Sequence, residues 1–224
     1  MNFFNNLPPV TKNIIIINVL VFLLQNVIPS FTIDFALHFY KSPDFEPYQL
    51  LTHMFMHGSF THILFNMFGV FMFGSALEYR LGSQKFFIYY LLTGFGAVIL
   101  HFLSMYWEGY DLIHQIEEAY SNGQINAVEY SNAYFNTFNV TVGASGALFG
   151  LLTGFGTLFP NQRIMLLFPP IPIKAKYFVL FYAGYELFRG FSNAPGDNIA
   201  HFAHLGGALF GFLIIRSWRK KGFL

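Results

Sequence analysis

Six apolar stretches are the feature that most constrains how this chain can fold. They lie near residues 13–29, 58–77, 84–106, 144–159, 175–190 and 198–217. A bilayer core about 30 Å thick is crossed by roughly 20 apolar residues in a helix, and lipid offers no partner to unpaired backbone groups. The stretches therefore predict an all-α polytopic membrane protein, in which residues 1–224 form a single domain with six membrane-spanning helices.

The composition agrees with a chain that is mostly surrounded by a lipid bilayer. Hydrophobic residues make up 54% of the sequence and charged residues 10%, and the mean hydropathy is +0.47. Soluble domains carry about 25% charged residues, so this chain lacks the polar surface of a water-soluble protein. The net charge of +1 is too small to indicate a nucleic-acid partner, and the lack of cysteine excludes disulfides and Cys-ligated metal sites.

The basic residues are distributed unevenly between the two sides that these stretches define. Ten of the twelve Lys and Arg residues fall before the first stretch, in the second and fourth connections, or at the end of the last stretch; only Lys41 and Arg189 fall on the other side. Because cytoplasmic segments carry an excess of Lys and Arg, we predict that both termini are cytoplasmic. A sequence without further recognisable domains is expected in a bacterial inner membrane.

Two connections differ from ordinary short loops. Residues 107–141 are acidic and contain no Lys or Arg, and we interpret them as an insertion on the outer side, mostly a solvated loop with a short helix near residues 112–120. Residues 160–174 contain four prolines and cannot form one continuous helix, because proline lacks the amide hydrogen and clashes with the preceding turn. We expect an interfacial turn there.

Two of the apolar stretches each carry one residue type that nucleophilic catalysis needs. Ser145 lies between Gly143 and Gly146, which allow close backbone approach, and His204 lies in the sixth stretch before a pair of glycines. A serine becomes a nucleophile when a histidine takes its proton, and an ionisable residue inside a span is a functional candidate. The alternative is a serine that only packs between helices, which explains the glycines but not the histidine.

These motifs resemble the rhomboid family of intramembrane serine proteases. The resemblance rests on Gly143-Ala144-Ser145-Gly146, on Ala203-His204-Leu205-Gly206-Gly207 and on His62-Ile63-Leu64-Phe65-Asn66, and it extends over about residues 10 to 218. It implies a rhomboid bundle of six transmembrane helices in which Ser145 and His204 form a catalytic dyad without an acidic third member. The nearest acidic residues in the sequence are Glu186 and Asp197.

The resemblance also assigns roles to residues around the dyad. His62 and Asn66 are four residues apart and so share one helix face; they would donate hydrogen bonds to the oxyanion together with the Ser145 backbone amide. Phe149 follows Ser145 by one helical turn and would stack on the His204 ring. The alternatives are a helix–helix hydrogen bond for His62 and Asn66, and a lipid-facing position for Phe149.

No metal or other cofactor is expected. His201 and His204 are three residues apart, but the chain lacks the His-Glu-x-x-His pattern of a zinc protease, and no Asp or Glu lies at ligand spacing from them in the sequence. The rhomboid motif selects His204 as the base, because His204 is followed by the paired glycines.

The predicted activity is that of an intramembrane serine endopeptidase that cleaves single-span membrane proteins within or near their transmembrane segment. The substrate would enter between the second and fifth stretches, with residues 191–198 as a cap. An alternative is a non-catalytic rhomboid-like protein that binds membrane clients, which the joint presence of Ser145, His204, His62 and Asn66 disfavours. A solute transporter is a weaker alternative, since only Glu186 supplies an acid within a stretch. The sequence indicates neither a natural substrate nor an oligomeric state.

Overall fold

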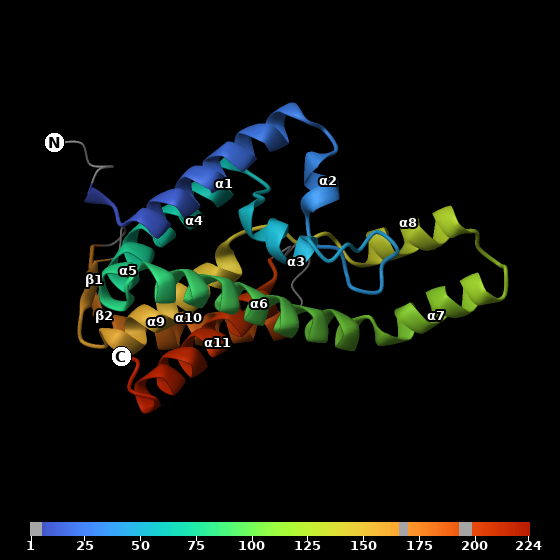
Figure 1. The fold of residues 1–224 in the computed structure, drawn as a ribbon. Coiled ribbons are helices and arrows are strands. Elements are labelled where there is room, and N and C mark those ends of the chain that lie inside the picture. The colour runs from blue at the N-terminus through green and yellow to red at the C-terminus, as the bar shows by residue number, and fades with distance from the viewer. Residues whose placement is uncertain (1–5, 166–169, 193–198) are drawn as a thin grey trace.

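A computed structural model describes residues 6–165, 170–192 and 199–224 (Figure 1). The elements are, in chain order, α1 (Pro9–Val27), α2 (Phe31–Phe35), α3 (Gln49–Thr52), η2 (His53–Phe55), α4 (Phe60–Gly69), η3 (Val70–Gly74), α5 (Ser75–Leu81), α6 (Ser83–Glu108), α7 (Tyr110–Ser121), α8 (Ala127–Thr137), α9 (Ser145–Leu158), β1 (Arg163–Met165), β2 (Pro172–Lys174), α10 (Ala175–Ser192) and α11 (His201–Lys220). The short π-helical turn η3 joins α4 to α5 in one helical run. The predicted all-α class is confirmed.

The long helices form one bundle, with α6, α9 and α11 packed side by side (Figure 1). The start of α1, the β1–β2 pair and the end of α11 lie at one end of this bundle, and α7 and α8 project from the opposite end. The basic segments at the start of α1, around the strands and at the end of α11 thus share one end, as their charge predicted. Which side of the membrane that end faces remains a prediction.

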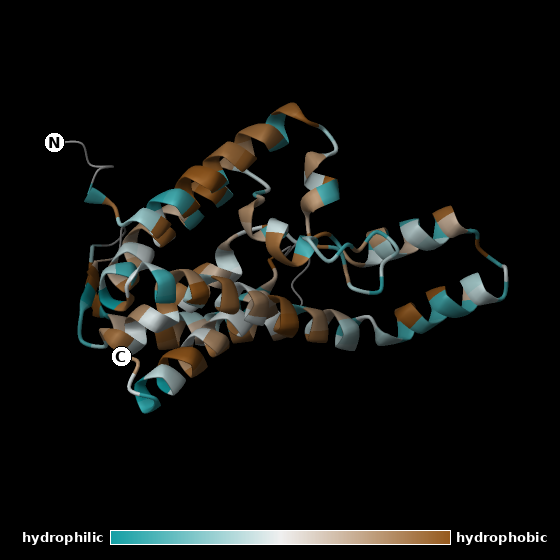
Figure 2. Cartoon of the chain, viewed as in Figure 1, coloured by the Kyte–Doolittle hydropathy of each residue, from teal (hydrophilic) through white to brown (hydrophobic). Residues whose placement is uncertain are grey.

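Among the described residues, three helical runs are long and apolar enough to cross a membrane. They are Pro9–Val27, Phe60–Leu81 and Ser83–Glu108, with 19, 22 and 26 residues. The apolar helix α9 has only 14 residues. Apolar residues run along the bundle, whereas hydrophilic residues gather near the strands and on α7 and α8 (Figure 2). These helices support an integral membrane protein, and the count of six spans remains a prediction.

Glycines allow the three central helices to approach one another closely. A Cβ on the glycines of α9 would overlap side chains of α6: Gly146 meets Ala97, Gly150 meets Thr93 and Gly154 meets Tyr89. Gly207 of α11 lies directly on the Gly146 carbonyl, and Gly211 lies on the Gly150 carbonyl. Small residues spaced by four are typical of tightly packed membrane helices. This packing fixes the start of α9 beside the first turns of α11.

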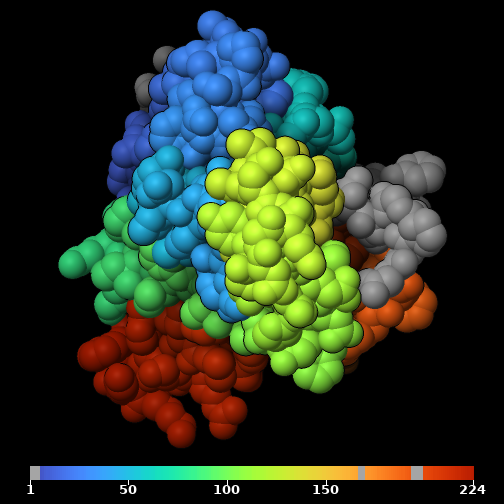
Figure 3. Space-filling view, turned by 90° about the vertical axis from the view of Figure 1, so that its right-hand side faces the viewer, coloured from blue at the N-terminus to red at the C-terminus, as the bar shows by residue number. Residues whose placement is uncertain are grey.

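Residues 107–141 form a helical hairpin, so the expectation of a mostly solvated loop is wrong. Helix α7 includes the predicted short helix, and α8 begins at a capping box formed by Asn126 and Glu129. The hairpin has an apolar core with the first loop, made of Phe39, Ile113, Ile116, Tyr134 and Phe138. The α7–α8 hairpin covers part of the end of the molecule that faces the viewer in Figure 3. The apolar residues of this insertion cover the first loop, which the sequence pattern alone does not reveal.

The proline-rich connection is interrupted as predicted, and its described part is a strand pair. Strands β1 and β2 are antiparallel, with Arg163 opposite Lys174. Residues 166–169 lie outside the described part of the chain. So do residues 193–198, which make up most of the predicted cap over residues 191–198.

Glu78 fastens the start of α1 to the end of α5. Its carboxylate accepts hydrogen bonds from the backbone amides of Val10 and Thr11, at 2.9 and 2.7 Å, and from the hydroxyls of Thr11 and Ser83. Glu78 is 2% exposed. A carboxylate is well placed at a helix N-terminus, where the first amides have no partner within the helix.

Candidate active site

Ser145 is the first residue of α9, and the chain reaches it through a conformation that requires glycine. Gly143 has a φ of +128° and donates its amide to the His53 carbonyl at 2.9 Å. A Cβ on Gly143 would lie 2.8 Å from His62 Nε2, so both the backbone angle and the space exclude other residues. The first-turn amides of α9 have no partners within the helix. Ser145 therefore lies among groups that can bind a developing negative charge.

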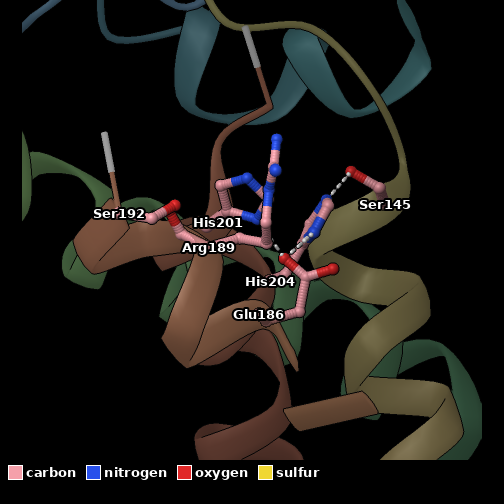
Figure 4. A network of polar contacts seen from close by, with 6 residues as sticks. All are labelled: Ser145, Glu186, Arg189, Ser192, His201 and His204. Atoms are coloured by element: carbon pink, nitrogen blue, oxygen red, sulfur yellow. Dashed lines mark hydrogen bonds and ion pairs between the residues drawn. The ribbon is translucent and has the colours of Figure 1, made fainter. Parts of the chain in front are cut away.

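His204 of α11 contacts this serine. His204 Nε2 lies 2.8 Å from Ser145 Oγ, which is a normal hydrogen-bond length. The His204 ring is stacked on Phe149, with ring centroids 4.2 Å apart and an interplanar angle of 7°. Figure 4 shows His204 between Ser145 and Glu186. The structure thus brings together the three side chains that the sequence assigned to nucleophile, base and aromatic support.

His62 and Asn66 reach the same place from α4. The Gly58 amide donates to His62 Nδ1 at 3.4 Å, so a neutral imidazole carries its proton on Nε2. Asn66 Nδ2 is buried and has no hydrogen-bond partner among the described residues. A Cβ built on Gly143 would lie 2.8 Å from His62 Nε2 and 3.7 Å from Asn66 Nδ2. Two side-chain donors therefore lie beside the loop that leads into Ser145.

A second histidine supports His62 without adding charge. The ring of His57 lies 5.0 Å from that of His62 at 69°. Burial lowers the pKa of His57 to about 4, because desolvation disfavours the charged imidazolium. His57 is therefore neutral at pH 7 and does not repel a proton on its neighbour.

A carboxylate contacts Nδ1, the ring nitrogen of His204 that does not face Ser145. Glu186 of α10 places Oε2 3.0 Å from His204 Nδ1 and 2.6 Å from His201 Nδ1 (Figure 4). Glu186 is 4% exposed. An ionised carboxylate only accepts hydrogen bonds, so each imidazole donates from Nδ1 to the same oxygen. A chain of hydrogen bonds thus runs from Glu186 on α10 through His204 on α11 to Ser145 on α9.

Ser145 and His204 border a cavity of about 1400 Å³, whereas Glu186 and His201 are not part of its lining. Its lining includes Ser145, His204, His62, Asn66 and Phe149. The cavity also reaches the base of the α7–α8 hairpin, where Glu108, Leu112 and Phe138 contribute to its wall. It is larger than the 300–1,000 Å³ typical of small-molecule pockets, and it has room for a segment of polypeptide.

A comparison with protein-family models gives a match over most of the chain. The Rhomboid domain model matches residues 44–220. The chain belongs to the rhomboid family. Rhomboid membership and the long apolar helices together make this chain an integral membrane protein.

Several curated relatives of this rhomboid are similar over part of their length. The Rhomboid protease GlpG of Klebsiella pneumoniae subsp. pneumoniae is 35% identical over 107 residues, which are 47% of this chain and 38% of the relative. The Rhomboid protease AarA of Providencia stuartii is 26% identical over 163 residues, 72% of this chain and 52% of the relative. RHOMBOID-like protein 6, mitochondrial, of Arabidopsis thaliana is 28% identical over 170 residues, 75% of this chain and 43% of the relative. The matched part is thus about half or less of the length of these relatives.

Two expectations about the site of this rhomboid are wrong. An acidic residue does lie against the histidine, since Glu186 contacts His204 Nδ1. An acid at ligand distance from His201 and His204 was also not expected, but Glu186 lies there. The ligand atoms of these three residues lie within 4.8 Å of one another, a spacing that suits a metal ion. Glu186 precedes His201 by 15 residues, and only the packing of α10 on α11 brings them together. The available signal was an acid inside an apolar stretch, which marks a functional candidate.

Proposed function

We propose that this rhomboid is an intramembrane serine endopeptidase, which cleaves single-span membrane proteins within or near their transmembrane segment. Ser145 is the nucleophile and His204 is the general base. The observation that carries the proposal is the 2.8 Å contact between His204 Nε2 and Ser145 Oγ at the wall of the cavity. The names of the relatives GlpG and AarA, both rhomboid proteases, support the same class of reaction.

The reaction begins when His204 Nε2 accepts the proton of Ser145 Oγ as that oxygen attacks the scissile carbonyl carbon. The electron pair of the carbonyl moves to its oxygen and forms a tetrahedral oxyanion. The C–N bond then breaks, and the imidazolium returns its proton to the leaving amine. In the second half, His204 takes a proton from water as the water oxygen attacks the ester carbonyl carbon. The bond between that carbon and Ser145 Oγ then breaks, His204 returns the proton to Oγ, and the carboxylic product leaves.

The oxyanion is stabilised by three donors that border the same cavity wall. They are the amide of Ser145 and the side chains of His62 and Asn66. Within the described part of the chain, Asn66 Nδ2 has no hydrogen-bond partner and His62 carries its proton on Nε2. Both donors support this role, because each is available to the oxyanion. Losing one such donor typically costs about 3–4 kcal/mol of transition-state stabilisation.

The membrane setting follows from the charge distribution. Basic segments gather at one end of the bundle and the α7–α8 hairpin lies at the other, so we infer that both termini are cytoplasmic. A bacterial inner membrane is the setting that we propose. The cavity then opens toward the outer side, where water for hydrolysis is available. A substrate helix would enter between the α4–α5 run and α10, since both border the cavity, and would unwind there to expose a peptide bond.

Cleavage of a tagged single-span reporter in liposomes tests the proposal. Wild-type protein should cleave the reporter in the presence of a chelator, whereas Ser145→Ala and His204→Ala should show no cleavage above background. Ser104→Ala is the matched control, because Ser104 on α6 donates to the His101 carbonyl; it should cleave like wild type. Cleavage that persists in Ser145→Ala would contradict the proposal. Binding of the reporter without cleavage by wild type would favour the client-binding alternative.

A further inference from the structure

We propose that Glu186 is a positioning residue that turns the Ser145–His204 pair into a Ser–His–Glu triad. The inference rests on the proposed function, since it assigns a partner to the general base of that reaction. Its starting point is the contact of Glu186 Oε2 with His204 Nδ1 at 3.0 Å, on the side of the ring opposite Ser145 (Figure 4). The carboxylate does not contact the reacting atoms and acts through the imidazole.

The contact with Glu186 determines which ring nitrogen of His204 carries the proton. A neutral imidazole carries one proton, and either nitrogen can hold it. The carboxylate accepts a hydrogen bond, so it keeps the proton on Nδ1 and leaves the lone pair on Nε2, 2.8 Å from Ser145 Oγ. Only this tautomer can take the proton of the serine. The acid of other serine proteases has the same task.

The negative charge of Glu186 also stabilises the positive charge that His204 acquires during the reaction. His204 becomes an imidazolium when it takes the serine proton, and Glu186 then faces that positive charge inside the bundle. Glu186 is 4% exposed, and charges attract more strongly where water is excluded. The proton on Nδ1 stays on His204 throughout, because the carboxylate stabilises the imidazolium without accepting that proton; only the Nε2 proton is exchanged with the substrate.

His201 helps to hold the Glu186 carboxylate in place. His201 Nδ1 donates to the same oxygen at 2.6 Å, and its ring lies at 84° to the ring of His204. A buried charge needs partners because it has lost its hydration, and the two imidazole N–H groups supply them. His201 thereby fixes the oxygen that orients His204.

Two substitutions of Glu186 test the assignment by cleavage of the reporter in liposomes. Glu186→Gln keeps the size of the side chain, but its amide can donate to Nδ1 and so favour the unproductive tautomer. We expect kcat to fall at least 100-fold with KM within twofold of wild type; an acid-to-amide change in another serine protease lowers kcat about 10⁴-fold. Glu186→Asp retains the carboxylate and should recover at least tenfold of that loss.

The matched control is Glu78→Gln, which neutralises another buried glutamate away from the cavity. It should lower thermal stability while the folded protein keeps the kcat of wild type. A kcat of Glu186→Gln within threefold of wild type would overturn the proposal, and so would an equal fall of kcat in folded Glu78→Gln. If wild type fails to cleave, or if Ser145→Ala still cleaves, the proposed protease function itself has failed.

A spectroscopic measurement tests the contact independently of turnover. In protein with ¹⁵N-labelled histidine, the His204 Nδ1 proton should give a downfield resonance that persists in Ser145→Ala. The resonance should shift upfield or disappear in Glu186→Gln. An unchanged His204 resonance in Glu186→Gln would overturn the triad whatever the reporter shows.

Discussion

The face of His204 lies on Phe149, and this stacking limits how far the imidazole can turn away from Ser145. We predict that Phe149→Leu lowers kcat about tenfold, because small misplacements of a catalytic group are costly. Initial rates of reporter cleavage measure the effect. Phe155→Leu is the control: Phe155 is on the same helix and equally buried, at 9% exposure, but contacts Phe73 and Phe159. Equal losses in both variants would show that packing, and not ring stacking, is responsible.

The site residues that could be chosen from the sequence are those marked by a short motif or by a spacing along one helix. Ser145 and His204 stand in short motifs, and the spacing of four between His62 and Asn66 specifies one helix face. The resemblance to rhomboids assigns the stacking role to Phe149, and its spacing of four residues places it on the same helix face as Ser145. Glu186 was recognised as an acid within an apolar stretch, but its contact with His204 was not predicted. That contact depends on how α10 crosses α11, and no spacing along the chain encodes the crossing.

At the scale of helices, the approach of α11 to α9 depends on glycine. A Cβ on Gly207 would overlap the Gly146 carbonyl, and backbone cannot rotate away as a side chain can. We predict that Gly207→Ala destabilises the protein by about 3 kcal/mol, the upper end of the usual cost of overpacking. Gly184→Ala on α10 is the control, because no atom of the described residues lies within 4 Å of a Cβ there. Unfolding in detergent measures both; an unchanged midpoint for Gly207→Ala would contradict the packing.

The elements differ in how well their sequence predicts them. The long apolar runs predicted the bounds of α1, α6 and the α4–α5 run to within a few residues, because a helix that faces lipid has a strongly apolar composition. The helix predicted at residues 112–120 lies within α7, but α8 and the hairpin that it forms with α7 were not predicted, because their apolar side chains pack on Phe39 of a distant loop. The β1–β2 pair was predicted only as an interruption, since three-residue strands are too short for a period.

An ion pair attaches the α7–α8 hairpin to the first loop. Lys41 Nζ lies 2.9 Å from Glu117 Oε1, and Tyr134 Oη also donates to Glu117 at 3.3 Å. The hydrogen bond from Lys41 lowers the pKa of Glu117 below 4.5 and raises that of Lys41 above 10.5. The stabilisation is therefore complete between about pH 4.5 and pH 10.5. It is lost as pH falls through the lowered Glu117 pKa or rises through the raised Lys41 pKa.

We predict that Glu117→Gln weakens this attachment by at most about 1 kcal/mol, because both side chains are partly exposed to water. Hydrogen exchange of the hairpin amides at pH 7 should be up to about fivefold faster in Glu117→Gln than in wild type. The difference should shrink as pH falls below 4.5. The exposed neighbour Glu118→Gln serves as control, and a wild-type-to-variant ratio that does not change with pH would contradict the ion pair.

For the whole molecule, the distribution of charge predicts how it sits in the membrane. The chain has no cysteine, so single substitutions report the two sides without background. In intact cells a membrane-impermeant maleimide should label Glu118→Cys in the hairpin, and should label Lys221→Cys only after permeabilisation. Labelling of both from outside, or of Lys221→Cys alone, would contradict the predicted orientation.

Activation of Ser145 by His204 can be tested by covalent labelling, which requires no choice of substrate. A fluorophosphonate probe reacts with an activated serine, and mass spectrometry locates the adduct. We predict an adduct on Ser145 in wild-type protein and none in folded His204→Ala or Ser145→Ala. An adduct on another residue, an unlabelled folded wild-type protein, or undiminished labelling in His204→Ala would contradict it.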